Sequence, residues 1–435
     1  MGEPKPKQPA VLTAADRSAI RPSEVAVGVI IGRASEYFDF FVYSIASVLV
    51  FPAVFFPFLP KLEAALASFL VFSFAFIARP LGTVVFMEIQ RRWGRGVKLG
   101  AALFLLGVST AGIAFLPGYA TLGVAAIALL SAFRFAQGIA LGGSWDGLPS
   151  LLALNAPERR RGWYAMVPQI GAPIGFIVAA GLFLYLHSSL SESDFLSWGW
   201  RYPFYVAFAI NVVALFSRLR IVLTEEYEHQ MEVRGLHPAH VGELLKARGG
   251  NLLIGAFAAL ASYALFHLIT VFPLSWITLQ SEQPVDDVLM IQIVGAFVAI
   301  PSIVASGLIA DKIGRRRTLG TLAVLIGVFA LCAPLLLKGG ALAQDVFILT
   351  GFVLLGLSYG QAAGAVTSNF EPRFRYTGAA LTSDLAWLIG AAFAPLVVLG
   401  LSARFGLAAV SVYLLSGVVA TLVALYINHR LDDER

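Results

Sequence analysis

The sequence predicts an all-α membrane protein with twelve transmembrane helices, arranged as two six-helix, pseudo-symmetric halves. Three observations predict this class: the composition, a series of long apolar stretches, and a repeat between the halves. Of the 435 residues, 58% are hydrophobic and only 13% are charged, whereas a soluble domain carries about 25% charged residues. This composition excludes a soluble enzyme of ordinary build, because so many apolar side chains need lipid around them.

The apolar stretches are separated by proline, glycine and charged residues, and each can supply the roughly 20 residues of a membrane-spanning helix. In the first half we expect helices at 26–56, 62–88, 98–116, 120–153, 162–187 and 201–223. In the second half we expect them at 250–273, 286–310, 318–337, 345–368, 377–401 and 405–428.

Polar segments divide the chain into five parts. Residues 1–25 contain four prolines and charges of both signs without the apolar core of a signal peptide, so they are predicted to be a cytosolic tail. The longest polar stretch, 224–248, predicts a cytosolic linker with some surface helix. The two helical bundles then occupy 26–223 and 249–428, and 429–435 form a second cytosolic tail.

Lysine and arginine gather in the predicted loops on one side of the bundle, and short loops rich in these residues face the cytosol. These residues are Arg91, Arg92, Arg95, Lys98, Arg159, Arg160, Arg161, Lys312, Arg315, Arg316, Arg317, Arg373 and Arg375. The opposite loops contain only Lys61, Lys338 and Arg404. Both termini are therefore predicted to be cytosolic, and the net charge of +5 needs no nucleic-acid partner to explain it.

A basic loop recurs at corresponding places in the two halves. Arg91-Arg92-Trp93-Gly94-Arg95 follows the second predicted helix, and Asp311-Lys312-Ile313-Gly314-Arg315-Arg316-Arg317 follows the eighth. Transporters built from such repeats bind their substrate at the interface of the repeats, near the middle of the bilayer. We therefore expect a substrate site between the two halves.

Six motifs follow one another in an order that is typical of one family. They are Glu36-Tyr37-Phe38-Asp39-Phe40, Ala78-Arg79-Pro80-Leu81-Gly82, Arg134-Phe135-Ala136-Gln137-Gly138, Pro168-Gln169-Ile170-Gly171-Ala172-Pro173, Trp198-Gly199-Trp200-Arg201-Tyr202-Pro203-Phe204 and Arg373-Phe374-Arg375-Tyr376-Thr377-Gly378. Through them the chain resembles the major facilitator superfamily, and within it the metabolite:proton symporters, from about residue 27 to residue 428. The resemblance implies the major facilitator fold, proton-coupled transport by alternating access, a monomer, and a location in the bacterial inner membrane.

The chain departs from this family's pattern at four places. The first basic loop has Arg91 where the family has an acid, and Ser144 replaces a glutamate, with Asp146 two residues further on. Asp384 replaces an asparagine or glutamine, and Arg33 replaces a small polar residue. These changes bear on the substrate and on gating rather than on the fold.

Charged residues inside the predicted helices indicate a functional site, because each costs about 2.5–3.5 kcal/mol at a helix centre unless it faces protein or water. Arg33 and Glu36 are three residues apart and can pair. Arg134 is the expected partner of the acids in the first helix. In related sugar porters an acid of the first helix faces an arginine of the fourth as a proton site, and the resemblance carries this role to Asp39 and Arg134; a fixed ion pair is the alternative. The predicted proton-coupling residues are Asp39, Glu36, Arg134 and Asp384.

Other polar and aromatic residues are candidates for substrate contact or for gating. The predicted substrate-binding residues are Arg33, Gln137, Gln169, Tyr263, His267, Tyr359, Gln361 and Trp387. A packing role competes with this prediction at Gln169, and a structural hydrogen bond competes with it at His267. The predicted gating residues, from the two basic loops, are Arg92, Arg95, Asp311 and Arg315.

The expected function is the import of a small organic acid together with protons. Arg33 and Arg134 favour a carboxylate, which guanidinium binds through two hydrogen bonds. The alternatives are a zwitterion such as a betaine or an amino acid, held by Asp384 and by a cation–π contact with Trp387, or a membrane enzyme or sensor that does not transport. No nucleotide-binding loop or metal-ligand spacing occurs, so neither a cofactor nor a metal is expected. The single cysteine, Cys332, excludes an internal disulfide.

Overall fold

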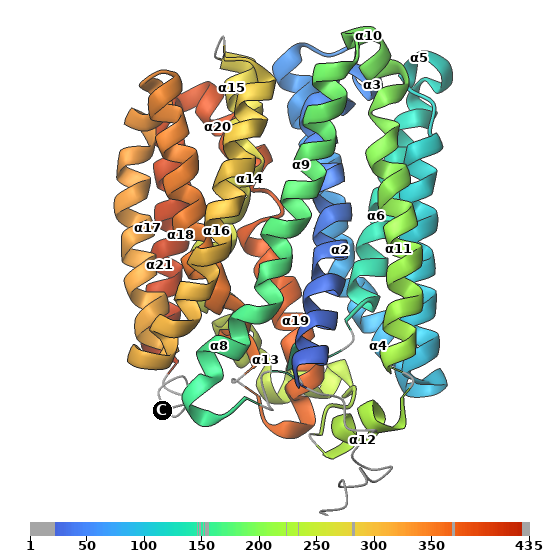
Figure 1. Cartoon of the computed structure of the whole chain (residues 1–435), viewed down its shortest axis with the longest axis vertical. Coiled ribbons are helices and arrows are strands. Elements are labelled where there is room, and N and C mark those ends of the chain that lie inside the picture. The colour runs from blue at the N-terminus through green and yellow to red at the C-terminus, as the bar shows by residue number, and fades with distance from the viewer. Residues whose placement is uncertain are drawn as a thin grey trace, which may run out of the picture.

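The structure is a computed structural model, in which we describe residues 22–428 except 146, 148, 151, 153–155, 223, 234, 281–282 and 368–369. Most of the predicted N-terminal tail, the predicted tail 429–435 and Asp146 therefore lie outside the described residues. The described chain is largely helical. Figure 1 shows helices of the first half, in blue to green, standing beside helices of the second half, in yellow to red.

The first half contains long helices joined by short turns. Its elements are α2 (Pro22–Leu49), α3 (Phe51–Phe55), α4 (Lys61–Phe115), α5 (Tyr119–Leu122), α6 (Val124–Gly143), η1 (Glu158–Arg160), α8 (Arg161–Met166), η2 (Val167–Ile170), α9 (Gly171–Ser189), α10 (Glu192–Asp194), η3 (Phe195–Gly199) and α11 (Arg201–Val222).

The second half follows a linker helix, α12 (Glu225–Val233). Its elements are α13 (Val241–Ala258), α14 (Leu260–Thr270), α15 (Phe272–Gln280), α16 (Val285–Ile313), α17 (Arg315–Lys338), α18 (Ala341–Thr367), α19 (Pro372–Gly390), α20 (Ala394–Phe405) and α21 (Ala408–Ile427). In Figure 1, α12 and α13 lie at the lower end of the bundle, which we call the linker end, and α3, α5 and α10 lie at the opposite end.

Ten stretches of the described chain are long and apolar enough to cross a membrane. One of them, α4, has 55 residues and holds two passes, since about 80 Å of helix far exceeds a bilayer core of about 30 Å. The first pass is α2, which is less apolar because Arg33, Glu36 and Asp39 lie inside it. The prediction of an all-α protein with twelve membrane-spanning helices is confirmed.

The helix pairings of the first half recur in the second. The second and fourth passes pack together as α4 with α6, and the eighth and tenth do so as α16 with α18. The third and sixth passes, α4 and α11, correspond in the same way to α17 and α21. This correspondence gives the pseudo-symmetry that the repeated loop predicts.

The two basic loops also share a backbone conformation. Gly94 has φ 86° and ψ 170°, and Gly314 has φ 87° and ψ 147°. A positive φ of this size favours glycine, because a Cβ is strained there. Each glycine therefore reverses the chain between two passes at the linker end.

Some helix boundaries differ from those predicted. Helix α6 ends at Gly143 rather than near residue 153, because the pair Gly142-Gly143 disfavours further helix. The seventh pass begins early, in α13, which runs through the end of the predicted linker and bends at Arg248, where φ is −142°.

Candidate functional site

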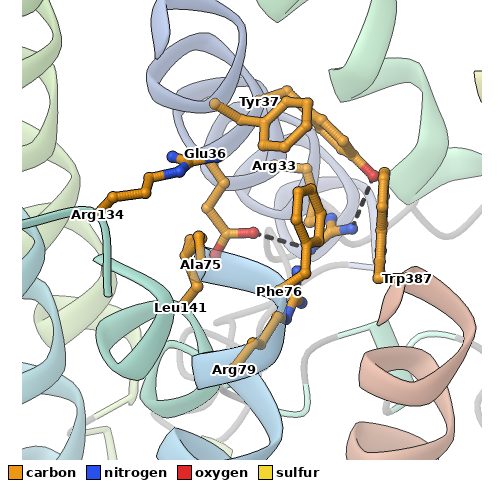
Figure 2. Close-up of a pocket in the computed structure, with 10 residues that line it drawn as sticks. Arg33, Glu36, Tyr37, Ala75, Phe76, Arg79, Arg134, Leu141 and Trp387 are labelled. Carbon is orange, nitrogen blue, oxygen red and sulfur yellow. Dashed lines mark hydrogen bonds and ion pairs between the residues drawn. The ribbon is translucent and has the colours of Figure 1, made fainter. Parts of the chain in front are cut away.

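A cavity lies inside the interface between the halves (Figure 2). It is lined by Arg33, Glu36, Tyr37 and Phe40 of α2, Ala75, Phe76 and Arg79 of α4, Arg134 and Leu141 of α6, and Trp387 of α19. The lining thus presents three guanidinium groups and one carboxylate together with four aromatic rings. The chemistry of this lining, cationic on one part and aromatic on another, suits a small molecule with an anionic group and an apolar body.

Close helix packing brings the arginines of α4 and α6 to this cavity. A Cβ on Gly138 would lie 2.2 Å from the backbone oxygen of Ala75, and one on Gly142 would lie 2.3 Å from that of Arg79. Such distances are possible only for glycine, so the backbones of the two helices are in direct contact. Arg79 and Arg134 are thereby held on neighbouring helices.

Glu36 is held by two arginines. Arg33 Nη1 lies 2.8 Å from Oε2, and Arg218 Nη1 lies 2.7 Å from Oε1. The predicted pairing of Arg33 with Glu36 is confirmed. Arg218 was not predicted, because a basic residue near the end of α11 is expected as a membrane flank; Gly32 leaves the space through which it reaches Glu36.

Asp384 binds a cationic group of the protein itself. Its Oδ1 accepts a hydrogen bond of 2.7 Å from Arg79 Nε, and its Oδ2 accepts one of 2.5 Å from Thr83 Oγ1. Arg79 and Thr83 belong to α4 and Asp384 to α19, so this ion pair joins the two halves. Arg79 occurs in one of the six motifs, yet its partner is 305 positions away and could not be read from spacing.

Asp39 and Arg134 do not form the direct ion pair that the sequence analysis expected. Asp39 Oδ1 instead accepts hydrogen bonds from Thr110 at 2.8 Å and Asn211 at 3.2 Å. Gln137 Nε2 donates to the Thr110 hydroxyl at 2.9 Å, and Arg134 Nη1 donates to Gln137 Oε1 at 3.0 Å. The acid and the arginine are thus connected through two neutral side chains, which separate the charges.

Arg134 is stabilised mainly by aromatic and backbone groups. Its guanidinium carbon lies 3.8 Å from the centre of the Tyr43 ring and 4.9 Å from that of Phe72. Its Nε donates to the Phe72 carbonyl at 3.2 Å. Among the described residues, Nη2 has no hydrogen-bond partner. Cation–π contacts with desolvated rings offset part of the cost of burying this charge.

Aromatic residues from both halves line the cavity beside Arg33. Trp387 stacks on Phe76 with a centroid distance of 6.0 Å and lies 5.1 Å from Tyr263. The hydroxyls of Tyr37 and Tyr359 form a hydrogen bond across the interface, and Arg33 donates to Tyr37 at 3.1 Å. Tyr263 and Tyr359 both contact the Trp387 ring and are not among the residues that line the cavity.

His267 is fully buried among rings of both halves. Its ring lies 5.4 Å from Phe40 and 5.3 Å from Phe72. Within the described part of the chain neither ring nitrogen has a hydrogen-bond partner, so the structural hydrogen bond considered for this residue is not formed.

Three glutamines were predicted to bind substrate, and none of them lines the cavity: Gln137 lies between Arg134 and Thr110, and Gln169 and Gln361 lie elsewhere. Gln361 Nε2 donates to the Gly162 carbonyl and to Ser306 Oγ, both at 3.2 Å, where α18 meets α8 and α16. Gln169 is buried in η2, and its amide oxygen has no partner among the described residues. Gln361 thus contributes to the packing of the halves in this conformation.

The family model of the Major Facilitator Superfamily matches residues 29–395. The chain belongs to the major facilitator superfamily. It is therefore a multi-pass membrane transporter and not an enzyme.

Relatives within the superfamily have several names. The inner membrane metabolite transport protein YhjE of Escherichia coli K12 is 38% identical over 94% of each chain. The shikimate transporter of the same organism is 29% identical over 96% of each chain, and the proline/betaine transporter of Salmonella typhimurium is 26% identical over 82% of this chain and 74% of its own. The proton:xylose symporter XylE has the same fold, with a TM-score of 0.70 and 19% identity over 92% of this chain and 94% of that structure.

At the linker end, Asp311 joins the halves. Its carboxylate at the end of α16 accepts hydrogen bonds from the backbone nitrogens of Gly162 at 2.6 Å and Trp163 at 3.3 Å, in α8. Arg315 is nearly buried, and its Nη2 lies 3.5 Å from the Arg161 carbonyl. These two predicted gating residues thus both contact the first half.

The first basic loop makes different contacts. Glu88 pairs with Arg91 at 2.8 Å and with Arg92 at 2.6 Å, so an acid one turn earlier partners the arginine that stands where the family has an acid. Arg92 is exposed and makes no link between the halves in the described residues. Arg95 donates to the carbonyl of Leu236 in the linker at 3.3 Å.

A second link at this end was not predicted. Lys98 Nζ, fully buried in α4, donates to Gln90 Oε1 and to the hydroxyl of Tyr376 in α19, both at 3.0 Å. The Tyr376 hydroxyl also donates to Gln90 Oε1 at 3.0 Å. Lys98 therefore joins the halves on the side where the first loop lacks an acid.

The halves also meet at the opposite end. His187 Nδ1 of α9 lies 2.6 Å from Asp286 Oδ1 of α16. Together with Asp311 at the linker end, this contact shows that both ends of the interface are joined in the conformation described here.

Proposed function

We propose that the protein is a proton-coupled symporter that imports a small organic acid by alternating access. The observation that carries the proposal is the cavity between the halves, whose lining presents Arg33, Arg79 and Arg134 against the single carboxylate of Glu36. A desolvated guanidinium binds a carboxylate strongly, because the hydrogen bonds are charge-assisted. We further propose a monomer in the bacterial inner membrane, with the linker end and both termini in the cytosol.

Asp39 is the proposed proton-coupling residue. Both of its hydrogen bonds fall on Oδ1, and among the described residues Oδ2 has no such partner, so it can carry a proton without breaking a bond. The chain of Thr110 and Gln137 connects Asp39 to Arg134 at the cavity. A substrate in the cavity lies beside Arg134 and can therefore alter the surroundings of Asp39.

A zwitterionic substrate is the second candidate. Tyr37, Phe40, Phe76 and Trp387 line the cavity with aromatic rings, and such rings attract quaternary ammonium groups. The predicted partner for that cationic end, Asp384, is already paired with Arg79. This pairing favours the organic acid.

Uptake by proteoliposomes under an imposed pH gradient tests the proposal. The panel contains mono-, di- and tricarboxylates, proline and glycine betaine. We expect accumulation of a carboxylate when the outside is acidic, and its loss when an uncoupler is added. Accumulation of glycine betaine or proline, with none of the mono-, di- or tricarboxylates accumulated, would establish the second candidate. If no compound of the panel accumulates, coupled transport is refuted.

Asp39→Asn tests the proton site in the same assay. We expect the variant to lose gradient-driven accumulation and to keep exchange of substrate across the membrane, because an amide cannot bind the coupled proton. Glu63→Gln is the matched control, since Glu63 is an exposed acid in the first turn of α4. Full accumulation by Asp39→Asn would move the proposed proton site to Glu36 or Asp384.

A further inference from the structure

Three arginines line the cavity, and the structure distinguishes them by which nitrogens are already engaged. Arg33 donates from Nη1 to Glu36 and from Nη2 to Tyr37. Arg134 donates from Nη1 to Gln137 and from Nε to the Phe72 carbonyl. Neither therefore has both terminal nitrogens available for a carboxylate.

Arg79 differs from both. Its Nε donates to Asp384, and within the described residues its two terminal nitrogens have no hydrogen-bond partner. Figure 2 shows its side chain extending towards Arg33 and Glu36 at the cavity. The edge of the guanidinium formed by Nη1 and Nη2 can accept a carboxylate through two parallel hydrogen bonds, a geometry that lysine cannot reproduce.

Asp384 holds Arg79 in this orientation. The acid is 3% exposed, and both of its oxygens are bound by residues of α4. Thr83 lies one helical turn beyond Arg79, and its hydroxyl donates to Oδ2 of Asp384, whereas Arg79 Nε donates to Oδ1. Both oxygens of the Asp384 carboxylate are thus held, and the edge of the Arg79 guanidinium formed by Nη1 and Nη2 faces the cavity.

We infer that Arg79 binds the carboxylate of the substrate through its two terminal nitrogens, that Asp384 positions Arg79 for this contact, and that the substrate is a monocarboxylate with an apolar ring or chain. The inference rests on the proposed function. For the same site it names Arg79 as the residue that anchors the substrate, and it names the substrate class. One such guanidinium edge accommodates one carboxylate. The rest of the ligand then lies against Phe40, Phe76 and Trp387.

The arrangement has a consequence for transport. Arg79 lies in the first half and Asp384 in the second, so the anchor is positioned only while α4 and α19 are in contact. The substrate is therefore bound most tightly when the halves close around it. When the halves separate at this level, Arg79 loses its orienting partner and the substrate is released more easily.

Binding of cyclohexanecarboxylate to the purified protein tests the inference, with cyclohexanecarboxamide as its uncharged analogue. We expect the wild type to bind the carboxylate at least tenfold more tightly than the carboxamide by titration calorimetry. Arg79→Lys should remove this preference while keeping the pairing with Asp384. Arg404→Lys is the control, because Arg404 is exposed and is not among the residues that line the cavity.

Asp384→Asn tests the positioning role. We expect the ratio of carboxylate to carboxamide affinity to fall at least threefold, whereas a general packing defect would weaken both ligands alike. Thermal unfolding of each variant shows whether it is folded. An unchanged ratio in Arg79→Lys, or a wild type that binds neither ligand, overturns the inference.

The binding assay also separates this inference from the proposed function. If coupled uptake of a carboxylate is observed and Arg79→Lys leaves the affinity ratio unchanged, the anchor is wrong and the function stands. If Arg79→Lys abolishes the ratio and no proton-driven uptake is found, the anchor stands and the coupling is wrong.

Discussion

Replacing Asp311 with asparagine is expected to open the linker end of the protein. The Asp311 carboxylate at the end of α16 accepts two backbone hydrogen bonds from α8, of 2.6 and 3.3 Å. These bonds join the second half to the first. The amide of asparagine can accept only through its oxygen, and its NH2 group would face a backbone N–H.

The size of the effect follows from these two contacts. A hydrogen bond to a charged group contributes about 1.5–3 kcal/mol, and the longer contact, at 3.3 Å, is the weaker of the two. We therefore expect Asp311→Asn to cost about 2 kcal/mol in the closed conformation. At about 1.4 kcal/mol per factor of ten, the population open at the linker end should rise roughly 30-fold.

Cysteine labelling measures this population. Met166 of α8 is buried and packs against Gly307 of α16, so Met166→Cys reports separation of the two helices in a Cys332→Ser background. Labelling by a maleimide follows the open population when closing is faster than labelling. Glu63→Gln is the control. A change of less than threefold in Asp311→Asn, in a folded protein, would refute the role of Asp311 in closing this end.

Two further predictions concern the first basic loop, with the same labelling assay and background. Arg91→Asp is expected not to tighten the linker end. The substitution removes the contacts of Arg91 with Glu88 and with His240 in the linker, and it places a second acid beside Glu88. A tenfold fall in labelling would contradict this prediction. Tyr376→Phe removes the hydroxyl by which α19 of the second half contacts Lys98 and Gln90, both in α4 of the first half. Labelling should therefore rise about fivefold to tenfold, for a loss of about 1 kcal/mol or slightly more. A labelling rate equal to that of the parent would show that this link does not hold the halves together.

The local part of the site could be predicted because it depends on helical spacing alone. Arg33 and Glu36 are three residues apart on one helix, and their pairing follows from that spacing. The position of three charges in the first helix indicated a functional site for a similar reason, because lipid excludes unpaired charge. Neither conclusion needed any knowledge of the neighbouring helices.

The partners of these charges could not be predicted. Asp39 binds Thr110 and Asn211, which are 71 and 172 positions away, and the expected direct contact with Arg134 is replaced by a chain of neutral side chains. Thr110, Asn211 and Gln137 are common residues in apolar helices, and nothing in their local sequence marks them as members of one network.

The sequence by itself determined the number of helices, their division into halves and the class of protein, because apolar length, loop charge and repeated motifs are properties of the chain read in order. The tertiary structure decided which charges meet. Arg79 and Asp384 are joined across 305 positions, and Lys98 meets Tyr376 across 278, since both pairs depend on how the two halves pack. Only the packed structure distinguishes Arg79 from Arg33 and Arg134, because it places Arg79 at the cavity with no hydrogen-bond partner on its terminal nitrogens among the described residues.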